Sequence, residues 1–232
     1  MKQKEPDFAT QVKQTLAKSP LSELPPALIE QLMADAQRMD IPRNTTIHNT
    51  DDNPLCALVI SGLIRIYMAS PDGRQITVRY VRNAELIGLA AVVGGPPPVS
   101  AQVLTDTRLL FLNGKTITRL GQDESRAGWV FAREMTHRLY DTLEALAANT
   151  FGSLRQRIVS HLLDLAASAP QTTSLVATIS QQELADAVGS VRPVVARILR
   201  DLRAEGLIET TQDGIALLDP ETLAAETWTK SV

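Results

Sequence analysis

The stretch ISQQELADAVGSVRPVVARILRDLRAEGLI, residues 179–208, decides the fold of this chain. It predicts two short helices joined by a tight turn. At the start of the first helix, Ser180 and Glu183 are spaced as a capping box, in which each side chain accepts the other residue's backbone N–H. Gly189 is expected to end this helix, because glycine takes a left-handed backbone without penalty. Ser190 is then expected to cap the second helix.

The second helix has an apolar side and a basic side. Apolar residues recur at i, i+3, i+4 and i+7, which predicts a buried stripe. Pro193 falls in the first turn, where its missing N–H costs nothing. The stripe consists of Val195, Ile198, Leu199 and Leu202, and the opposite side carries Arg192, Arg197, Arg200 and Arg203.

Such a helix suits the DNA major groove, because a guanidinium fork can bind guanine edges or phosphates. A solvated helix face is the alternative, and a run of charges alone would favour it. The capped helix-turn-helix spacing favours DNA. Two short apolar runs, Ile208–Thr210 and Ile215–Leu218, then flank Asp213-Gly214 and predict a β-hairpin. Together these elements predict a winged helix-turn-helix.

The composition limits the class of protein. The 232 residues allow one or two domains, and the polar start does not resemble a signal peptide. No apolar run approaches the roughly 20 residues that a membrane helix needs. A single cysteine, Cys56, excludes an internal disulfide framework and is expected to be a small core residue. These features predict a cytoplasmic protein without a membrane partner.

The net charge of −3 is unusual for a DNA-binding protein, but residues 190–203 carry four arginines and one aspartate. The positive charge is therefore local. Because few phosphates would be neutralised, non-specific DNA binding should be weak and specific binding should dominate.

Upstream, the pattern changes twice. Residues 7–36 are apolar at helical intervals, with breaks at Ser19-Pro20 and Pro25-Pro26 that predict two or three short helices. From Ile41 to Leu112, short apolar runs alternate with Gly, Pro and Asp turns, which is typical of a β-sandwich or barrel. The predicted fold class is therefore α+β.

Residues 123–149 predict one long helix, since they contain no proline and one glycine. Apolar side chains recur at alternating intervals of three and four, as in a coiled coil. A parallel pairing with a second copy would bury this seam; the alternative is a helix packed on its own β-domain. The seam consists of Ala132, Met135, Leu139, Thr142 and Leu146.

Phe151-Gly152-Ser153 is expected to break this helix, and Ser153 and Gln156 are spaced as another capping box. We therefore expect three parts: residues 1–122 as a β-domain with N-terminal helices, 123–152 as dimerisation helix and hinge, and 153–232 as the DNA-binding domain.

A β-barrel, a long helix and a winged helix in this order resemble the Crp/Fnr superfamily of bacterial transcription regulators. The resemblance covers nearly the whole chain, and it rests on the order and spacing of several motifs. It implies a homodimer whose sensor domain is a double-stranded β-helix like that of cyclic-nucleotide-binding proteins. The motifs include residues 60–67, 72–74, 85–88, 100–101, 155–158, 182–185 and 191–199.

The resemblance also places an effector pocket, and here the chain departs from the family. Cyclic-AMP binders of the family carry a glutamate and an arginine in their phosphate-binding cassette, where this chain has Leu89 and Val99. An anionic phosphate needs a cation or several N–H donors. We therefore expect no cyclic AMP in the usual mode, but an apolar or bulky ligand or ligand-free DNA binding. The degenerate pocket comprises Gly88, Leu89, Ala90, Val99, Ser100, Ala101 and Thr142.

By the same resemblance, Arg192 and Arg197 match arginines that the family uses on guanine and nearby DNA. Pro193 stands where a glutamate often reads cytosine, so base choice there should be looser or depend on a thymine methyl. The implied DNA-binding residues are Ser180, Gln181, Ser190, Arg192, Pro193, Val194, Arg197 and Arg200. The implied partners are a palindromic operator, a second copy and, for an activator, RNA polymerase.

Other sensor types and functions fit less well. The family's oxygen sensors need a cysteine cluster, and a haem sensor needs an axial ligand from His48, His137 or His161. We expect these histidines to be ordinary ones, and we expect no metal or cofactor. A barrel enzyme would need clustered metal ligands or a nucleophile–base pair, and the sequence shows neither. A ligand-binding module without DNA-reading function is the third alternative.

Overall fold

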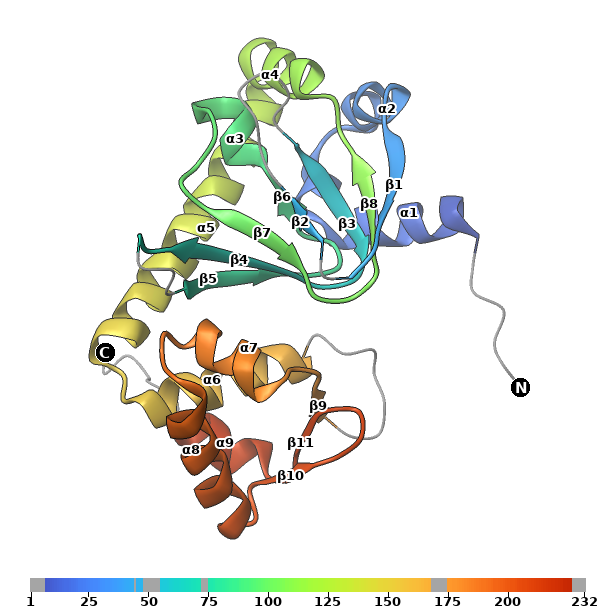
Figure 1. Cartoon of the computed structure of the whole chain (residues 1–232). Helices are drawn as coiled ribbons and strands as arrows, with labels where there is room; N and C mark the ends of the chain where they lie inside the picture. Colours follow the sequence, from blue (N-terminus) through green and yellow to red (C-terminus); the bar gives the residue numbers. More distant parts are fainter. Residues whose placement is uncertain (1–6, 44, 48–54, 72–74, 168–174, 227–232) are drawn as a thin grey trace. The chain divides into compact units, whose positions relative to one another are not determined.

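The structure, a computed structural model, describes residues 7–43, 45–47, 55–71, 75–167 and 175–226 (Figure 1). These residues form two compact units. The first contains the described residues up to Ile66 and Tyr80–Asp141; the second contains the described parts of Tyr67–Arg79 and of the chain from Thr142 onward. The boundary after Asp141 falls inside a single long helix.

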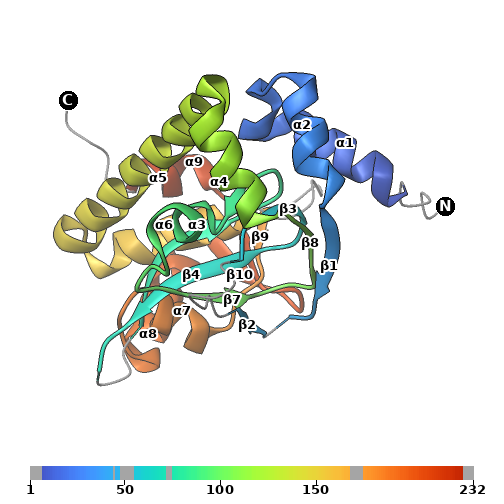
Figure 2. The ribbon, with the colours of Figure 1, turned by 90° about the horizontal axis from the view of Figure 1, so that it is seen from above.

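Short helices open the first unit, as the two proline breaks predict. They are α1 (Phe8–Lys18), the 3-10 helix η1 (Pro20–Glu23) and α2 (Pro26–Ala34). The carboxylate of Asp7 accepts the backbone N–H of Thr10 at 2.7 Å and caps α1. In Figures 1 and 2 α2 lies beside α4 (Gly114–Asp123), and the two helices are in contact.

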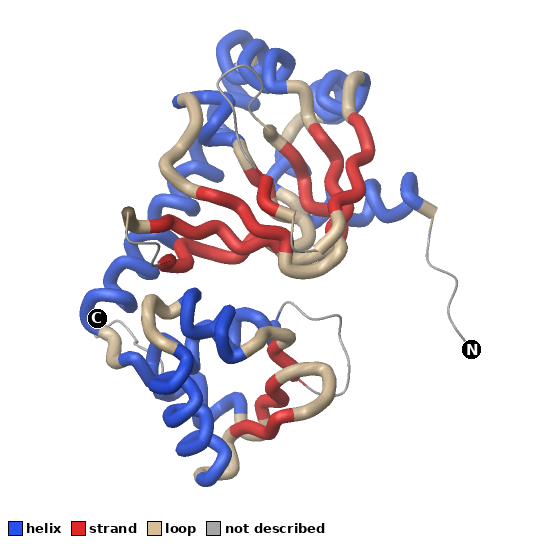
Figure 3. Tube along the Cα trace, viewed as in Figure 1, coloured by secondary structure: helices blue, strands red, loops and turns tan. Residues whose placement is uncertain are grey.

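Among the described residues from Gln37 to Phe111, eight strands build two sheets, shown in red in Figure 3. One sheet has the order β1-β8-β3-β6 and the other β2-β7-β4-β5. Strand β3 pairs antiparallel with β8, and the register shifts between Val59 and Ser61. The strands are β1 (Gln37–Ile41), β2 (Thr46–Ile47), β3 (Ala57–Ser61), β4 (Ile64–Ala69), β5 (Gln75–Val81), β6 (Leu86–Ile87), β7 (Ser100–Val103) and β8 (Thr107–Phe111).

The predicted fold class is confirmed: the β-domain is jelly-roll-like, and its strands form two sheets that do not close into a barrel. Two of the sheet edges, β2 and β6, have only two residues each. The other two edges, β1 and β5, have five and seven residues, so each sheet ends on one short and one longer strand.

Several elements carry no clear signal in the sequence. Strand β1 is charged and largely exposed, so it does not alternate between apolar and polar residues. The cassette contains a short helix, α3 (Leu89–Gly94), that the sequence did not predict. Helix α4 precedes the long helix, which begins at Ser125.

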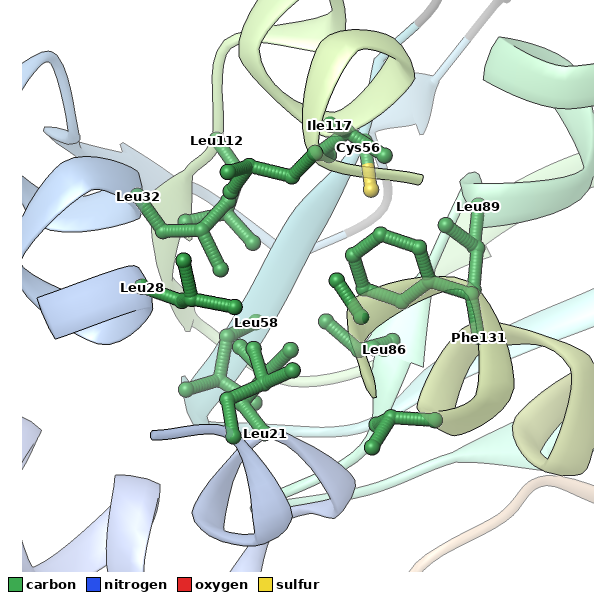
Figure 4. Packing of buried hydrophobic residues seen from close by; sticks show 14 of the residues in the cluster. Leu21, Leu28, Leu32, Cys56, Leu58, Leu86, Leu89, Leu112, Ile117 and Phe131 are labelled. Carbon is green, nitrogen blue, oxygen red and sulfur yellow. The ribbon is translucent and has the colours of Figure 1, made fainter. Parts of the chain in front are cut away.

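Between these elements lies a hydrophobic core, part of which is drawn in Figure 4. It joins the N-terminal helices to the first sheet and to the beginning of the long helix α5 (Ser125–Phe151). Cys56 is completely buried in it, and burial raises the pKa of its thiol to about 12. The thiol is therefore protonated at neutral pH and acts as a small core side chain, as predicted.

In the second unit, helices surround a three-stranded sheet of order β10-β11-β9. The predicted hairpin is confirmed, with Thr211 donating its N–H to the carbonyl of Gly214 at 2.8 Å. The third strand, β9, was not predicted. The elements after α5 are α6 (Leu154–Ala167), β9 (Leu175–Ala177), α7 (Gln181–Ala187), α8 (Arg192–Ala204), β10 (Ile208–Thr210), β11 (Ile215–Leu217) and α9 (Pro220–Glu226).

The break between α5 and α6 lies at the predicted place. At Gly152 the chain passes so close to the carbonyl oxygen of Ala148 that a Cβ would lie 2.4 Å from it. The backbone N–H of Ser153 donates to Oε1 of Gln156 at 2.8 Å, and Gln156 donates its own N–H to the Ser153 hydroxyl at 3.2 Å. This predicted capping box therefore starts α6 immediately after the break.

Candidate DNA-reading surface and sensor cassette

Helix α7 begins with the predicted capping box. Glu183 donates its backbone N–H to the hydroxyl of Ser180 at 3.2 Å, and Ser180 donates its own to the Glu183 carboxylate at 2.8 Å. Leu184 and Val188 are fully buried on the inner side. Ser180 itself is exposed and Gln181 is half-buried, so both side chains are partly open to solvent.

The turn after α7 is a Schellman motif, in which backbone groups close the end of the helix. Ser190 donates its N–H to the carbonyl of Ala185 at 2.8 Å, and Gly189 donates to Asp186 at 3.3 Å. Gly189 has a φ of +63°, as the left-handed position requires. The expectation that Ser190 caps α8 is wrong, because this motif uses Ser190 and moves the cap to Val191.

Helix α8 presents the predicted two sides. Val195, Leu199 and Leu202 are buried, while Ile198 is half-buried. Arg192, Pro193, Arg197 and Arg200 are exposed, and Val194 lies between the two sides. The helix therefore packs by its apolar stripe and leaves three guanidinium groups and a proline ring available to a partner.

Arg203 differs from the other arginines of α8. Its Nη1 donates to the hydroxyl of Thr210 on β10 at 2.8 Å. This bond ties the end of α8 to the hairpin, so Arg203 contributes to holding the wing.

A second arginine holds the C-terminal ends of two helices. Arg155, near the start of α6, donates Nη1 to Glu205 at 2.8 Å and Nε to Glu226 at 2.8 Å. The carboxylates of Glu226 and Glu205 raise the pKa of the Arg155 guanidinium above its ordinary value. Because Glu205 is the C-cap of α8 and Glu226 ends α9, one fork fixes both ends relative to α6.

In the cassette, the chain places an apolar side chain where the resemblance implied a glutamate. Gly88 is left-handed at the start of α3, and Leu89 is 3% exposed, within the hydrophobic core. Figure 4 shows Leu89 beside Phe131 of α5. Leu89 therefore fills the core and offers no polar atom to a ligand.

Along the rest of the cassette, polar side chains are few. Val99 is half-buried and donates its N–H to the carbonyl of Pro97 at 2.7 Å. Ser100 is half-buried at the start of β7 and Ala101 is buried, whereas Ala90 is exposed. No charged side chain occurs between Gly88 and Ala101, so this segment itself provides no cation for a phosphate.

Helix α5 exposes a largely apolar row, which shares three members with the predicted seam of five. Ala132, Leu139 and Leu146 are exposed as expected, but Met135 packs against the core of the first unit. Thr142 is exposed as well. The exposed row, with alternating spacings of three and four, consists of Trp129, Ala132, Thr136, Leu139, Leu143 and Leu146.

The opposite side of α5 carries a buried carboxylate. Glu134 is 3% exposed and accepts from Nε of Arg138 at 2.7 Å. Arg138 also lies 3.6 Å from a carboxylate oxygen of Glu85 and donates to Asp141 at 3.0 Å. This arginine therefore neutralises the buried glutamate and links α5 to the loop before β6.

Two known domain families match the N-terminal and the C-terminal parts of this chain. The cyclic nucleotide-binding domain family matches residues 38–124, and the Crp-like helix-turn-helix domain family matches residues 156–226. The transcriptional regulator LdrP of Thermus thermophilus is 34% identical over 168 residues, which are 71% of this chain and 83% of LdrP. The chain belongs to the Crp/Fnr superfamily of transcription regulators.

Solved structures of the superfamily share the fold. A CRP-family transcriptional regulator from Thermus thermophilus is 30% identical, with a TM-score of 0.68 over 81% of this chain and 95% of that one. The c-di-GMP responsive regulator CLP of Xanthomonas campestris is 26% identical, with a TM-score of 0.67 over 83% of this chain and 99% of that one. The match extends across sensor and DNA-binding parts.

These findings confirm the predicted superfamily, the winged helix-turn-helix and the assignment as a regulator and not an enzyme. His48, a conceivable barrel ligand, lies outside the described residues. Among the residues that are described, no helix has the length and apolarity that crossing a membrane requires.

Three functional features were missed from the sequence. The N-cap at Val191 was predictable, because Ser190 follows the glycine that ends α7 and its backbone N–H therefore belongs to the Schellman motif. The two arginine clusters, centred on Arg138 and Arg155, join residues far apart in the chain. No local pattern predicts such partners.

Proposed function

We propose that this regulator acts as a homodimer that pairs through the exposed row on α5 and binds a two-fold symmetric operator in the cytoplasm. The exposed row carries the proposal: Leu139, Leu143 and Leu146 are 55%, 51% and 61% exposed. Exposing three large apolar side chains to water at coiled-coil spacing on one helix is unfavourable, and pairing with a second copy would bury them. Two recognition helices then read two half-sites.

A charge in the row tests the dimer. Leu139→Arg should give monomers, because two arginines would face each other in the closed interface. His137→Arg is the matched control, since His137 is exposed on the same helix but lies off the row. Sedimentation equilibrium measures the mass of each variant. A dimeric Leu139→Arg protein would show that the interface lies elsewhere.

On the DNA side, we propose that Arg192 and Arg197 contact bases or the phosphates beside them. Both side chains are exposed on α8, whereas Arg203 is bound to Thr210. Arg192→Ala should remove preference at one symmetric position, while Arg203→Ala should at most weaken binding to all sequences alike. Binding-site selection at one salt concentration compares them. If Arg192→Ala and Arg197→Ala both leave the selected motif unchanged, α8 is not the reading helix.

For the sensor, we propose that cyclic AMP does not bind in the family's usual mode. The burial of Leu89 and the lack of charge between Gly88 and Ala101 support this. Calorimetric titration with cyclic AMP, cyclic GMP and cyclic di-GMP separates the possibilities. A micromolar site for either mononucleotide would contradict the proposal. The Xanthomonas relative responds to c-di-GMP, so the dinucleotide serves as the bulky candidate. Where the regulator activates transcription, RNA polymerase is the further partner.

A further inference from the structure

The residue at the N-cap of α8 neither caps the helix with its side chain nor packs into the core. Val191 is the N-cap and makes no side-chain hydrogen bond there. Valine is among the poorest N-caps, whereas Ser, Asp and Asn are the best. The Val191 side chain is also 61% exposed, so it adds little to the core. A residue that contributes neither to the cap nor to packing is expected to serve recognition.

The same turn is poorly equipped to bind a phosphate. A helix N-terminus binds anions through several free backbone N–H groups. Here Val194 and Val195 both donate to the carbonyl of Val191, at 3.1 and 3.2 Å, and Pro193 has no N–H. Two N–H groups of this turn are therefore engaged and one is missing, so the tip of α8 favours an apolar contact over an anionic one.

Arginines surround the apolar tip. Pro193 is exposed one helical turn before Arg197, and Arg192 stands between Val191 and Pro193. Residues four apart on a helix are neighbours on its surface. The tip therefore presents a valine and a proline ring beside two guanidinium groups that suit DNA.

We propose that Val191 and Pro193 read the 5-methyl group of thymine next to a guanine held by Arg192 or Arg197. Among the four standard bases, thymine is the one that presents an apolar group, its C5-methyl, in the major groove. The inference rests on the proposed function of α8 and adds the chemical group that its tip recognises. Loss of one such methyl contact should weaken binding about fourfold per half-site.

Deoxyuridine provides the test, because it removes the methyl group and keeps every hydrogen-bonding group of thymine. The full-length protein is first used to select its operator from random DNA. Each thymine of the half-site is then replaced by deoxyuridine, symmetrically, and affinities are measured at one salt concentration. Wild type should bind about fourfold more weakly per half-site at the thymine under Val191.

Val191→Ser should discriminate less than wild type between the thymine and deoxyuridine operators, because only the Pro193 part of the methyl contact remains. Serine is the better N-cap, so this variant is expected to fold and its loss of discrimination has a local cause. Leu218→Ser is the matched control: Leu218 is 55% exposed in the same unit but outside α7 and α8, and this variant should discriminate as wild type does.

Two outcomes would overturn the inference. If the protein binds its operator specifically and no deoxyuridine substitution matters, methyl reading fails while the proposed function stands. If Val191→Ser and Pro193→Ala both discriminate as wild type does, another residue reads the methyl group. If no operator is selected at all, the proposed function fails and the inference falls with it.

Discussion

The two helices of the helix-turn-helix end alike and begin differently. Both close with a Schellman motif around a left-handed glycine, Gly189 after α7 and Gly206 after α8. Helix α7 begins with a complete capping box at Ser180, but α8 begins at Val191 with no side-chain cap. The C-terminal ends of both helices and the start of α7 are therefore capped, whereas the start of α8, at the surface proposed to meet DNA, has no side-chain cap.

The largest expected effect tests whether the C-terminal ends of α7 and α8 are equivalent. Gly189→Ala and Gly206→Ala should each lower the free energy of unfolding by about 1–2 kcal/mol, because a left-handed backbone is strained for alanine. Urea denaturation at fixed protein concentration measures both. Gly121→Ala is the control, since its helical position leaves a new Cβ 3.5 Å from Phe131. Clearly unequal losses at the two turns would mean that the ends are not equivalent.

The next effect concerns the start of α7. Ser180→Ala should lower the free energy of unfolding by about 1 kcal/mol, because it removes the acceptor for the N–H of Glu183. Ser190→Ala should change it by no more than a few tenths, since the Schellman motif uses only the backbone of Ser190. Thermal unfolding of the two variants compares them. A large loss for Ser190→Ala would restore the sequence prediction that Ser190 caps α8.

A smaller effect of opposite sign is expected at the start of α8. Val191→Ser should raise the free energy of unfolding by about 0.5–1 kcal/mol. Its hydroxyl can accept only from Val194, because Pro193 carries no N–H. Urea midpoints measure the gain. A loss of stability in this variant would show that Val191 supports the fold, and the contrast with α7 would then be structural.

The smallest effect concerns the far end of α8 and its dependence on pH. The hydrogen bond from Arg155 holds the pKa of Glu205 below its ordinary value of 4.5. The folded state therefore binds this proton less readily than the unfolded state. The contribution is complete above pH 4.5 and is lost as the pH falls through the lowered pKa.

Glu205→Gln should accordingly reduce the acid-induced loss of stability below about pH 4.5. Glu209→Gln is the control, because Glu209 is exposed on β10 and makes no ion pair in the described structure. Unfolding curves between about pH 3 and pH 6 compare the two variants. An unchanged acid limb in Glu205→Gln would remove Glu205 from the account of acid stability.

Local features of the fold were predictable because their causes lie within a few residues. The capping boxes at Ser180 and Ser153, the break at Gly152 and the hairpin around Gly214 each follow from neighbours in the chain. The same holds for the two sides of α8, since helical spacing alone separates Val195 and Leu199 from Arg197.

The sequence by itself determined the order of the elements, the winged helix-turn-helix and the uncharged cassette, because spacing and composition set all three. Tertiary structure alone decided that the strands form two sheets and that Met135 turns into the core while Leu143 stays exposed. It also decided the partners of Arg138 and Arg155. Each of these depends on which distant segments pack together, and the free energy of that packing belongs to no single stretch of the chain.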